Sequence, residues 1–301
     1  MGIREKGFDM KKKIARIEDK CILCMQCVKD CASGVWREID GLPVPLAPEL
    51  CNRCSHCLSI CPENAIVNDY LESDQVRPVR RELINSEVFR EIVLSRRSIR
   101  HFQDKPIAPE IISDIIDVSR YAPTASNSQH VGYIVITDPK ILLEISSLVF
   151  STASKLHEYA GTRTGKLLFK GLKLNPAMDA VIRKYIEPMS YYIELKESGR
   201  DLILHHAPAL VLLHGPALSF FGADNCNIAA GTMIHYAHSL GLGTCFIGFV
   251  TLVSRFNKKL RQLIRLPKGR TVYASLVLGY PAIRHPNTVS RKAPGVQWII
   301  G

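Results

Sequence analysis

Residues 21–31 read CILCMQCVKDC, and residues 51–62 read CNRCSHCLSICP. These two stretches hold eight of the ten cysteines of a 301-residue chain, and both follow the spacing C-x2-C-x2-C-x3-C. Three cysteines at intervals of three can wrap one loop around a cube of iron and sulfide, while the fourth begins a new turn and points toward a second cube. The duplicated spacing therefore predicts two iron–sulfur clusters.

Disulfides and structural zinc are the alternatives for so many cysteines. Disulfides need an oxidising compartment, and the basic stretch 4–13 is not followed by the apolar run of a secretory signal. Zinc sites usually draw on separated C-x2-C pairs rather than triplets. We therefore expect a cytoplasmic protein whose cysteines hold iron, in an iron-rich and anaerobic cell.

The duplicated motif resembles the bacterial two-[4Fe–4S] ferredoxins over roughly residues 14–70. In that pattern the fourth cysteine of each motif ligates the other cluster. The resemblance implies that cluster one is held by Cys21, Cys24, Cys27 and Cys61, and cluster two by Cys51, Cys54, Cys57 and Cys31. One departure is Ala32, which stands where the family usually has proline and where the second motif has Pro62.

The overall composition is that of a soluble globular protein, with 47% hydrophobic and 22% charged residues. The formal net charge of +11 is spread along the chain, and no nucleic-acid-binding signature accompanies it. The best apolar stretch, 207–221, is interrupted by two prolines and a histidine. We expect neither a nucleic-acid partner nor a membrane partner.

The rest of the chain alternates between helical and strand patterns. Helices are expected at 87–96, after Pro109, after Asp138-Pro139 and at 225–240, and strands at 131–137, 209–213 and 272–278. This pattern predicts an α+β fold with a central sheet flanked by helices. We expect a two-cluster ferredoxin domain at 1–75, a linker at 76–85, and a second domain at 86–301 with a helical insertion around 152–200.

Four segments of the second domain combine features that suit a phosphate group and a flat ring. The first, RRSIR at 96–100, places three guanidinium groups and a hydroxyl where they can grip a phosphate. The small-residue stretch 122–129 and the glycine-rich stretch 241–248 allow a flat ring to approach the backbone. The fourth, LGYP at 278–281, precedes the basic pair Arg291 and Lys292.

In this order the four segments resemble the nitroreductase family of FMN-dependent reductases, over about residues 86–292. The resemblance implies phosphate contacts from Arg96, Arg97, Ser98, Arg100 and Arg291. It implies contacts with the isoalloxazine ring from Pro123, Thr124, Ala125, Asn127, Cys245, Phe246, Ile247 and Gly248. It also implies a homodimer with both flavins at the subunit interface. The departure is Gly248-Phe249, where the best-known members have Glu-Gly.

These resemblances together predict an FMN-dependent oxidoreductase of the nitroreductase family. Electrons would pass from a low-potential donor, such as a ferredoxin-like protein, through the two [4Fe–4S] clusters to FMN. Reduced FMN would then deliver hydride to a small organic acceptor: a nitroaromatic, quinone, enone or flavin. The alternative is an electron-transfer adaptor that serves another redox protein. The choice between ferredoxin and NAD(P)H as donor stays open, as do the substrate and the roles of the insertion, His205 and His206.

Overall fold

The computed structural model describes residues 13–72 and 75–301, which divide by their contacts into two units. We call them the cysteine unit, which comprises the described residues up to Asn85 together with Ala125–Ser128, and the sheet unit, which comprises Ser86–Thr124 and Gln129–Gly301. The chain therefore changes unit at Asn85, and it returns once to the cysteine unit for four residues.

The cysteine unit is built from two short strand pairs and two one-turn helices. Strand β1 (Ile14–Arg16) pairs antiparallel with β4 (Ile66–Asn68), and β2 (Trp36–Ile39) pairs with β3 (Leu42–Pro45). Each cysteine motif contains a five-residue helix, α1 (Gln26–Asp30) in the first and α2 (His56–Ile60) in the second. The other elements in the described part of this unit are 3-10 turns: η1 (Glu18–Lys20), η2 (Pro48–Leu50), η4 (Arg81–Leu83) and η5 (Ala125–Asn127).

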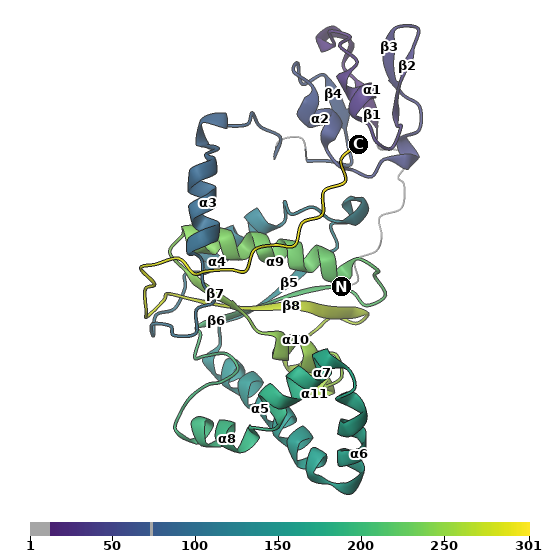
Figure 1. Cartoon of the computed structure of the whole chain (residues 1–301). Helices are drawn as coiled ribbons and strands as arrows, with labels where there is room; N and C mark the ends of the chain where they lie inside the picture. Colours follow the sequence, from purple (N-terminus) through teal and green to yellow (C-terminus); the bar gives the residue numbers. More distant parts are fainter. Residues whose placement is uncertain (1–12, 73–74) are drawn as a thin grey trace. The chain divides into compact units, whose positions relative to one another are not determined.

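The sheet unit has a four-stranded antiparallel sheet in the order β5-β6-β8-β7 (Figure 1). Its strands are β5 (Gly132–Ile136), β6 (Ala209–Pro216), β7 (Gly243–Phe246) and β8 (Arg270–Gly279). The helices α3 (Ser86–Ser95), α4 (Pro109–Ser119) and α9 (Gly222–Ser239) lie on one side of it. The opposite side carries α5 (Pro139–Gly161), α10 (Gly248–Ser254) and α11 (Lys258–Leu263). This confirms the expected α+β fold.

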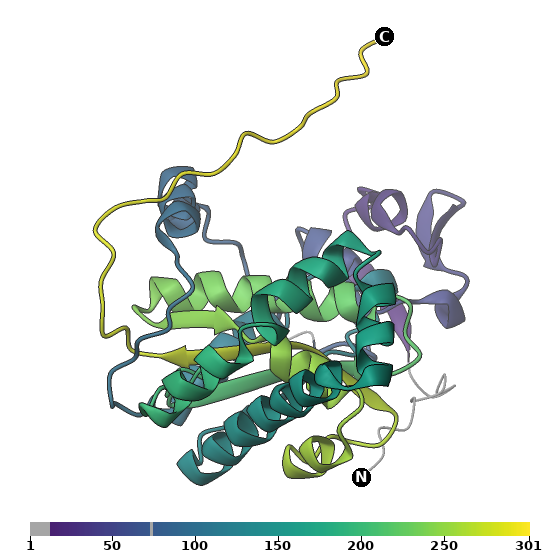
Figure 2. The same ribbon diagram turned by 60° about the horizontal axis from the view of Figure 1, so that its bottom comes forward.

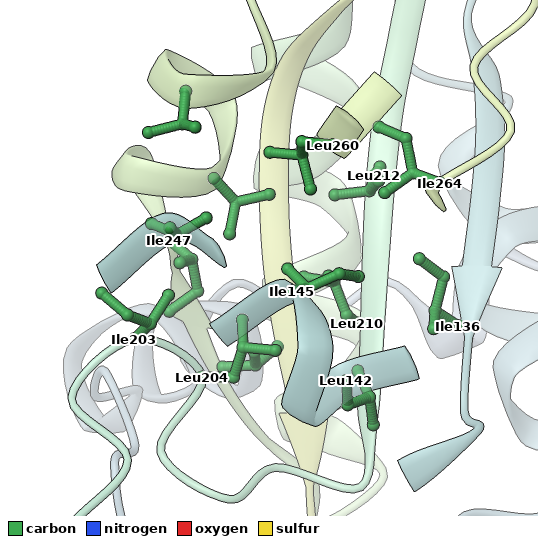
Figure 3. Close-up of a cluster of buried hydrophobic side chains, with 14 of the residues drawn as sticks. Ile136, Leu142, Ile145, Ile203, Leu204, Leu210, Leu212, Ile247, Leu260 and Ile264 are labelled. Atoms are coloured by element: carbon green, nitrogen blue, oxygen red, sulfur yellow. The ribbon is translucent and has the colours of Figure 1, made fainter. Parts of the chain in front are cut away.

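The central strand β6 is apolar at every position from Ala209 to Leu213 because helices cover both of its faces. Successive side chains of a strand point to opposite faces. Leu210 and Leu212 accordingly join the buried cluster under α5, α10 and α11 (Figure 3), whereas Val211 and Leu213 join the cluster under α4 and α9. The two layers of core hold the sheet, and through it the edge strand β7, in a fixed place.

The helix starts follow from local chemistry that the sequence displays. Pro109 and Pro139 each occupy a first helical turn, where a missing N–H costs nothing. Asp138 caps α5 by accepting from the N–H groups of Lys140 and Ile141. Just after the C-terminal end of α9, Gly241 has a φ of +78°, a left-handed conformation that glycine adopts without steric cost.

The expected insertion differs from the structure in where it begins. Helix α5 runs without a break through residue 152. Its buried Phe150 belongs to the cluster under α5, α10 and α11, which we call the main core. The helices that follow, shown across the near side of the sheet in Figure 2, are α6 (Arg163–Leu172), α7 (Pro176–Val181), a π-helical turn η6 (Ile182–Ile186) and α8 (Met189–Glu197). Met189 is 2% exposed and packs in the main core, so this region is partly core and not only a cover.

Candidate functional site

The eight motif cysteines line two pockets of the cysteine unit, four in each. Cys21, Cys24, Cys27 and Cys61 share one pocket with Ile66. The other is lined by Cys31, Cys51, Cys54 and Cys57, together with Trp36 and Asn68. The structure therefore brings the cysteines together in the two interleaved sets expected from the spacing, with one cysteine of each motif crossing to the other set.

Both cysteine loops adopt the same unusual backbone. Leu23 and Met25 in the first loop have φ values of 56° and 58°, and Arg53 and Ser55 in the second have 58° and 63°. Non-glycine residues in this left-handed region are strained, and such strain persists only where the surrounding structure requires it. Here the repeated conformation lets each loop curve so that its three cysteines face one pocket.

Burial keeps the most enclosed thiols protonated in the absence of a bound group. It raises the pKa of Cys27 to about 11 and also raises the pKa of Cys57. Within the described ranges, no three His, Cys, Asp or Glu side chains converge on a single metal ion. Four thiols around one pocket are the donor set of a [4Fe–4S] cluster, which is wider than one ion, so the residues fit that group. Cluster binding would have to remove these protons.

A second candidate site, in the sheet unit, is strongly cationic. Burial lowers the pKa of Arg96, and the neighbouring charges of Arg97 and Arg291 lower it further. Arg97 donates from its two terminal nitrogens to backbone carbonyls, including that of Asn287, but its buried Nε has no hydrogen-bond partner. The guanidinium groups of Arg97 and Arg291 lie close enough to that of Arg96 to repel it, and Arg97 Nε has no acceptor. Together the three groups form a site for an anion.

The other residues of the arginine segment, as we call residues 96–100, contact the edge strand β7 near its start. Burial raises the pKa of the Cys245 thiol, and the neighbouring Arg100 and Ser98 act in the opposite direction. Ser98 forms a parallel bridge with Thr244, and the N–H of Ile99 donates to the carbonyl of Thr244 at 3.0 Å. A Cβ at Gly243 would lie 2.6 Å from Ile99 Cγ1, so glycine is required there. This glycine therefore admits the arginine segment, a role different from the flavin contact expected of the glycine-rich stretch.

Two histidines lie beside the arginines of this site, and both are held toward the neutral form. His238 Nε2 lies 2.8 Å from Ser95 Oγ, at the end of α3, and burial together with the charge of Arg96 lowers its pKa. Burial also lowers the pKa of His205, with Arg100 acting in the same direction and Asp201 opposing it. A neutral His205 beside Arg100 is available to donate or accept a hydrogen bond.

His206 has a structural role in the described structure. Its backbone N–H donates to Asp201 Oδ2 at 3.1 Å, and its Nε2 lies 3.1 Å from the N–H of Asp201. Burial alone would raise the pKa of Asp201, but hydrogen bonds from Ser146 and from backbone N–H groups outweigh it and the pKa is lowered. His206 and Asp201 thus brace the turn that presents His205.

The last four residues of the glycine-rich stretch 241–248, Cys245 to Gly248, divide into buried and open residues. Cys245 and Ile247 are each 4% exposed and belong to the main core, and the Ile247 N–H is taken by the carbonyl of Ser275. Phe246 and Gly248 instead line an open pocket of about 250 Å³. Of the expected ring contacts in this segment, these two are the ones accessible to a ligand.

The residues of the small-residue stretch 122–129 are divided between the two units. Thr124 Oγ1 accepts the N–H of Gln129 at 3.1 Å, which closes the turn after Pro123. Ala125 and Asn127 fall in the segment grouped with the cysteine unit, where Asn127 Nδ2 donates to the carbonyls of Asn52 and Arg53 at 3.0 and 2.9 Å. The amide group expected to meet the flavin ring is therefore engaged with backbone carbonyls.

Sequence reasoning missed Trp36 and Asn68, two buried side chains with N–H groups that line the pocket of Cys51. Trp36 is 2% exposed and Asn68 is 3% exposed. Neither lies in a cysteine motif, and their position depends on strand pairing rather than on spacing. No local signal in the sequence marks them.

The sheet with helices on both faces and the cationic site at its edge strand define a class of anion-binding α+β protein. The nitroreductase family model matches residues 93–280, more than half of the chain. An FMN reductase [NAD(P)H] of Bacillus subtilis is 30% identical over 189 residues, which cover 62% of this chain and 64% of that protein. The chain thus spans less than two thirds of that relative.

Two further comparisons concern the fold and the cysteine-rich region. A nitroreductase with bound FMN from Bacteroides fragilis superposes with a TM-score of 0.51 at 18% identity, covering 72% of this chain and all of that one. One component of an ion-translocating oxidoreductase complex of Methanosarcina acetivorans is 39% identical over 62 residues, which are 21% of this chain and 22% of that protein.

The chain belongs to the nitroreductase family. The expected family is thereby confirmed. No helix in the described part of the chain is both long enough and apolar enough to cross a lipid bilayer.

Proposed function

We propose that this protein takes electrons singly from a low-potential donor into two [4Fe–4S] clusters and passes them to FMN for the reduction of a small organic acceptor. The observation that carries the proposal is the presence, in one chain of this family, of two four-cysteine pockets and a domain with a cationic anion site. A [4Fe–4S] cluster carries one electron at a time, and FMN exchanges electrons singly or as a hydride.

The cysteine unit would hold both clusters through the two sets that line its pockets. Cluster one takes Cys21, Cys24, Cys27 and Cys61, and cluster two takes Cys31, Cys51, Cys54 and Cys57. The 62-residue match to the Methanosarcina protein is compatible with this assignment. The chain supplies the thiolates and a largely apolar surround, which together favour binding of the clusters over exposure of their iron to water.

The sheet unit would hold the FMN phosphate between Arg96, Arg97, Ser98, Arg100 and Arg291. The buried Nε of Arg97 supports this placement, because a phosphate oxygen would supply its missing acceptor. Within the sheet unit, the residues proposed for the ring fall in two groups, Pro123 with Thr124, and Cys245 with Phe246, Ile247 and Gly248. Within the second group Phe246 and Gly248 would make the direct contacts, since Cys245 and Ile247 are buried.

A second copy of this chain is the proposed partner within a homodimer. Large apolar side chains of the sheet unit are left open, with Phe220 97% exposed, Leu218 96% exposed and Trp298 80% exposed. Water contact with these apolar side chains is unfavourable, and burial against a second copy would remove it. Gel filtration at the FMN-loaded stage should give twice the mass of the 33.7 kDa chain.

The donor experiment uses stopped-flow bleaching of the flavin in the full chain. Reduced methyl viologen, a one-electron donor, should reduce the FMN much faster than NAD(P)H does. Cys54→Ser, which removes a ligand of cluster two, should abolish this advantage, whereas Cys226→Ser, at a buried cysteine outside both pockets, should keep it. Equal rates in the Cys54→Ser variant and the unaltered chain would mean that the clusters are not the entry route.

The acceptor is tested separately by steady-state turnover of the reduced full chain with nitroaromatics, quinones, enones and free flavins. Turnover of any of these supports a small-molecule reductase. Failure with all of them, combined with rapid oxidation by a redox protein, would favour the adaptor function instead.

A further inference from the structure

The two cysteine pockets differ in the side chains that face their sulfurs. Two polar side chains, Trp36 and Asn68, line the pocket of cluster two and are almost entirely buried. Buried polar groups are costly unless they are hydrogen-bonded, so each should have a specific partner there. In both cases that partner is a cysteine sulfur.

Asn68 is held with its amide nitrogen toward cluster two. Its Nδ2 donates to Cys51 Sγ at 3.8 Å, and its Oδ1 accepts the N–H of Tyr70 at 3.1 Å. The second bond fixes which end of the amide faces the sulfur. Its backbone is fixed as well, because β4 places Asn68 opposite Ile14 in the antiparallel pair.

Trp36 provides the second donor to the same cluster. Its indole lines the pocket together with Cys57, another ligand of cluster two, and the interaction of its N–H with that sulfur opposes the effect of burial on the pKa of Cys57. The indole can only donate, so this contact has one possible direction. Cluster two therefore receives side-chain N–H groups at two of its four ligands.

Cluster one lacks the corresponding donors. The motifs repeat thirty residues apart, as Cys21 and Cys51 show, so the counterpart of Trp36 is Ile66 and that of Asn68 is Glu38. Ile66 lines the pocket of cluster one but has no polar hydrogen, and Glu38 is exposed. In the described residues, the hydrogen bonds found to cluster-one sulfurs come from backbone N–H groups, those of Ala65 to Cys61 and Val28 to Cys27.

Backbone donors do not explain the difference, because cluster two has them too. The N–H of Arg53 donates to Cys51 at 3.4 Å, and that of Leu58 donates to Cys57. The backbone contributions are therefore similar, and the asymmetry lies in the indole and the amide.

Hydrogen bonds to the sulfurs of a cluster stabilise its more negative, reduced state and raise its reduction potential. We propose, on the basis of the cluster assignment above, that cluster two has the higher potential of the pair and that Trp36 and Asn68 set the gap. An electron that enters the cysteine unit then settles on cluster two, and cluster one is the more strongly reducing centre. Both side chains are positioning residues that act through the ligand sulfurs.

The experiment is a redox titration of the full chain, followed by electron paramagnetic resonance, with iron and sulfide analysis of every sample. Trp36→Phe keeps the ring and removes the N–H, and Asn68→Leu keeps the shape and removes the amide. Trp298→Phe makes the same change at a side chain that is 80% exposed and serves as the control. Paramagnetically shifted cysteine β-proton signals assign each titration step to its cluster.

Each of the two variants should lower the one-electron equilibrium constant of cluster two about tenfold, which corresponds to about 59 mV. The step of cluster one and the control should stay in place. If Asn68→Leu fails to retain its clusters, Trp36→Phe alone carries the test. Full iron content with both steps unmoved, or a shift confined to cluster one, would overturn this inference alone. An unaltered chain that takes up no iron and sulfide would overturn the cluster assignment itself.

Discussion

The cysteine unit and the sheet unit are stabilised in different ways. In the cysteine unit the buried apolar cluster is small, and Cys27 is itself one of its members, with Cys31, Cys51, Cys57 and Cys61 packed against it. In the sheet unit two larger clusters pack on opposite faces of β6 and β8 and include no motif cysteine. A small core that includes the cysteine ligands depends on the bound cluster for its stability, because binding of the cluster to the cysteines supplies part of the folding free energy. The larger unit can fold first and bind its cofactor afterwards.

The largest expected effect follows from removing the clusters. A chain carrying Cys24→Ser and Cys54→Ser should lose iron and sulfide, and residues 13–72 should lose amide protection because their core is incomplete. Strands β6 and β8 should stay protected. Hydrogen exchange on the full chain measures both units at once, and Cys226→Ser is the matched control. Protected amides in residues 13–72 without iron would show that this unit folds unaided.

A cavity in the sheet unit should have the converse effect. Leu212 is fully buried between β6 and α5, α10 and α11, so Leu212→Ala should lower the free energy of unfolding of this unit by about 2–5 kcal/mol. Leu174→Ala, at a side chain 86% exposed, should change it by less than about 0.5 kcal/mol. Urea titration followed by circular dichroism gives both values. Iron content should be unchanged, and its loss in Leu212→Ala would mean that the units do not fold independently.

A smaller effect is expected at the phosphate site. Arg96→Ala removes a charge-assisted contact worth about 1.5–3 kcal/mol, so FMN affinity should fall about tenfold or more. Arg183→Ala is the control, since this exposed arginine pairs with Asp179 far along the chain in the helical region. Fluorescence titration with FMN measures the affinity. Retention of unaltered affinity by Arg96→Ala would place the phosphate elsewhere.

The smallest expected effect is an acid sensitivity of the sheet unit. His214 accepts from Arg270 Nε at 2.9 Å, and burial, with the Arg270 charge, lowers its pKa from 6.5 to about 4. The folded state favours neutral His214, so this stability is present above pH 6.5 and is lost as pH falls toward 4. The loss is at most about 1.4 kcal/mol per pH unit. Unfolding midpoints at pH 7, 6 and 5 should depend on pH less in His214→Gln than in the control His285→Gln.

The sequence predicted those elements whose cause is local. Pro109 and Asp138-Pro139 predicted two helix starts, and the unbroken apolar run after Ala209 predicted a strand covered on both faces. The interleaving of the cysteines was also predictable, since a three-residue spacing leaves the fourth cysteine on a new turn. For Arg96, Arg97 and Arg291, the order of motifs predicted a shared site, and the structure brings their charges together.

What the sequence could not predict depends on contacts between distant segments. Gly243 is required by Ile99, which reaches it from a segment more than a hundred residues earlier. The engagement of Asn127 with Asn52 and Arg53 is equally long-range, as is the approach of Asn68 to Cys51. The start of the helical insertion was misplaced because charge and tyrosine content changed inside α5, while its buried face continued to Phe150.

The pairing of β1 with β4 has a consequence for how such a chain arises. Ile14 lies opposite Asn68, so the chain enters and leaves the cysteine-rich region at neighbouring points. A region with adjacent ends can be joined to, or excised from, another polypeptide by a short connection without disturbing its own fold. The eight-cysteine region is thus suited to gene fusion. Joined to another flavin enzyme, it would serve as a module that supplies electrons, provided that it binds the proposed clusters.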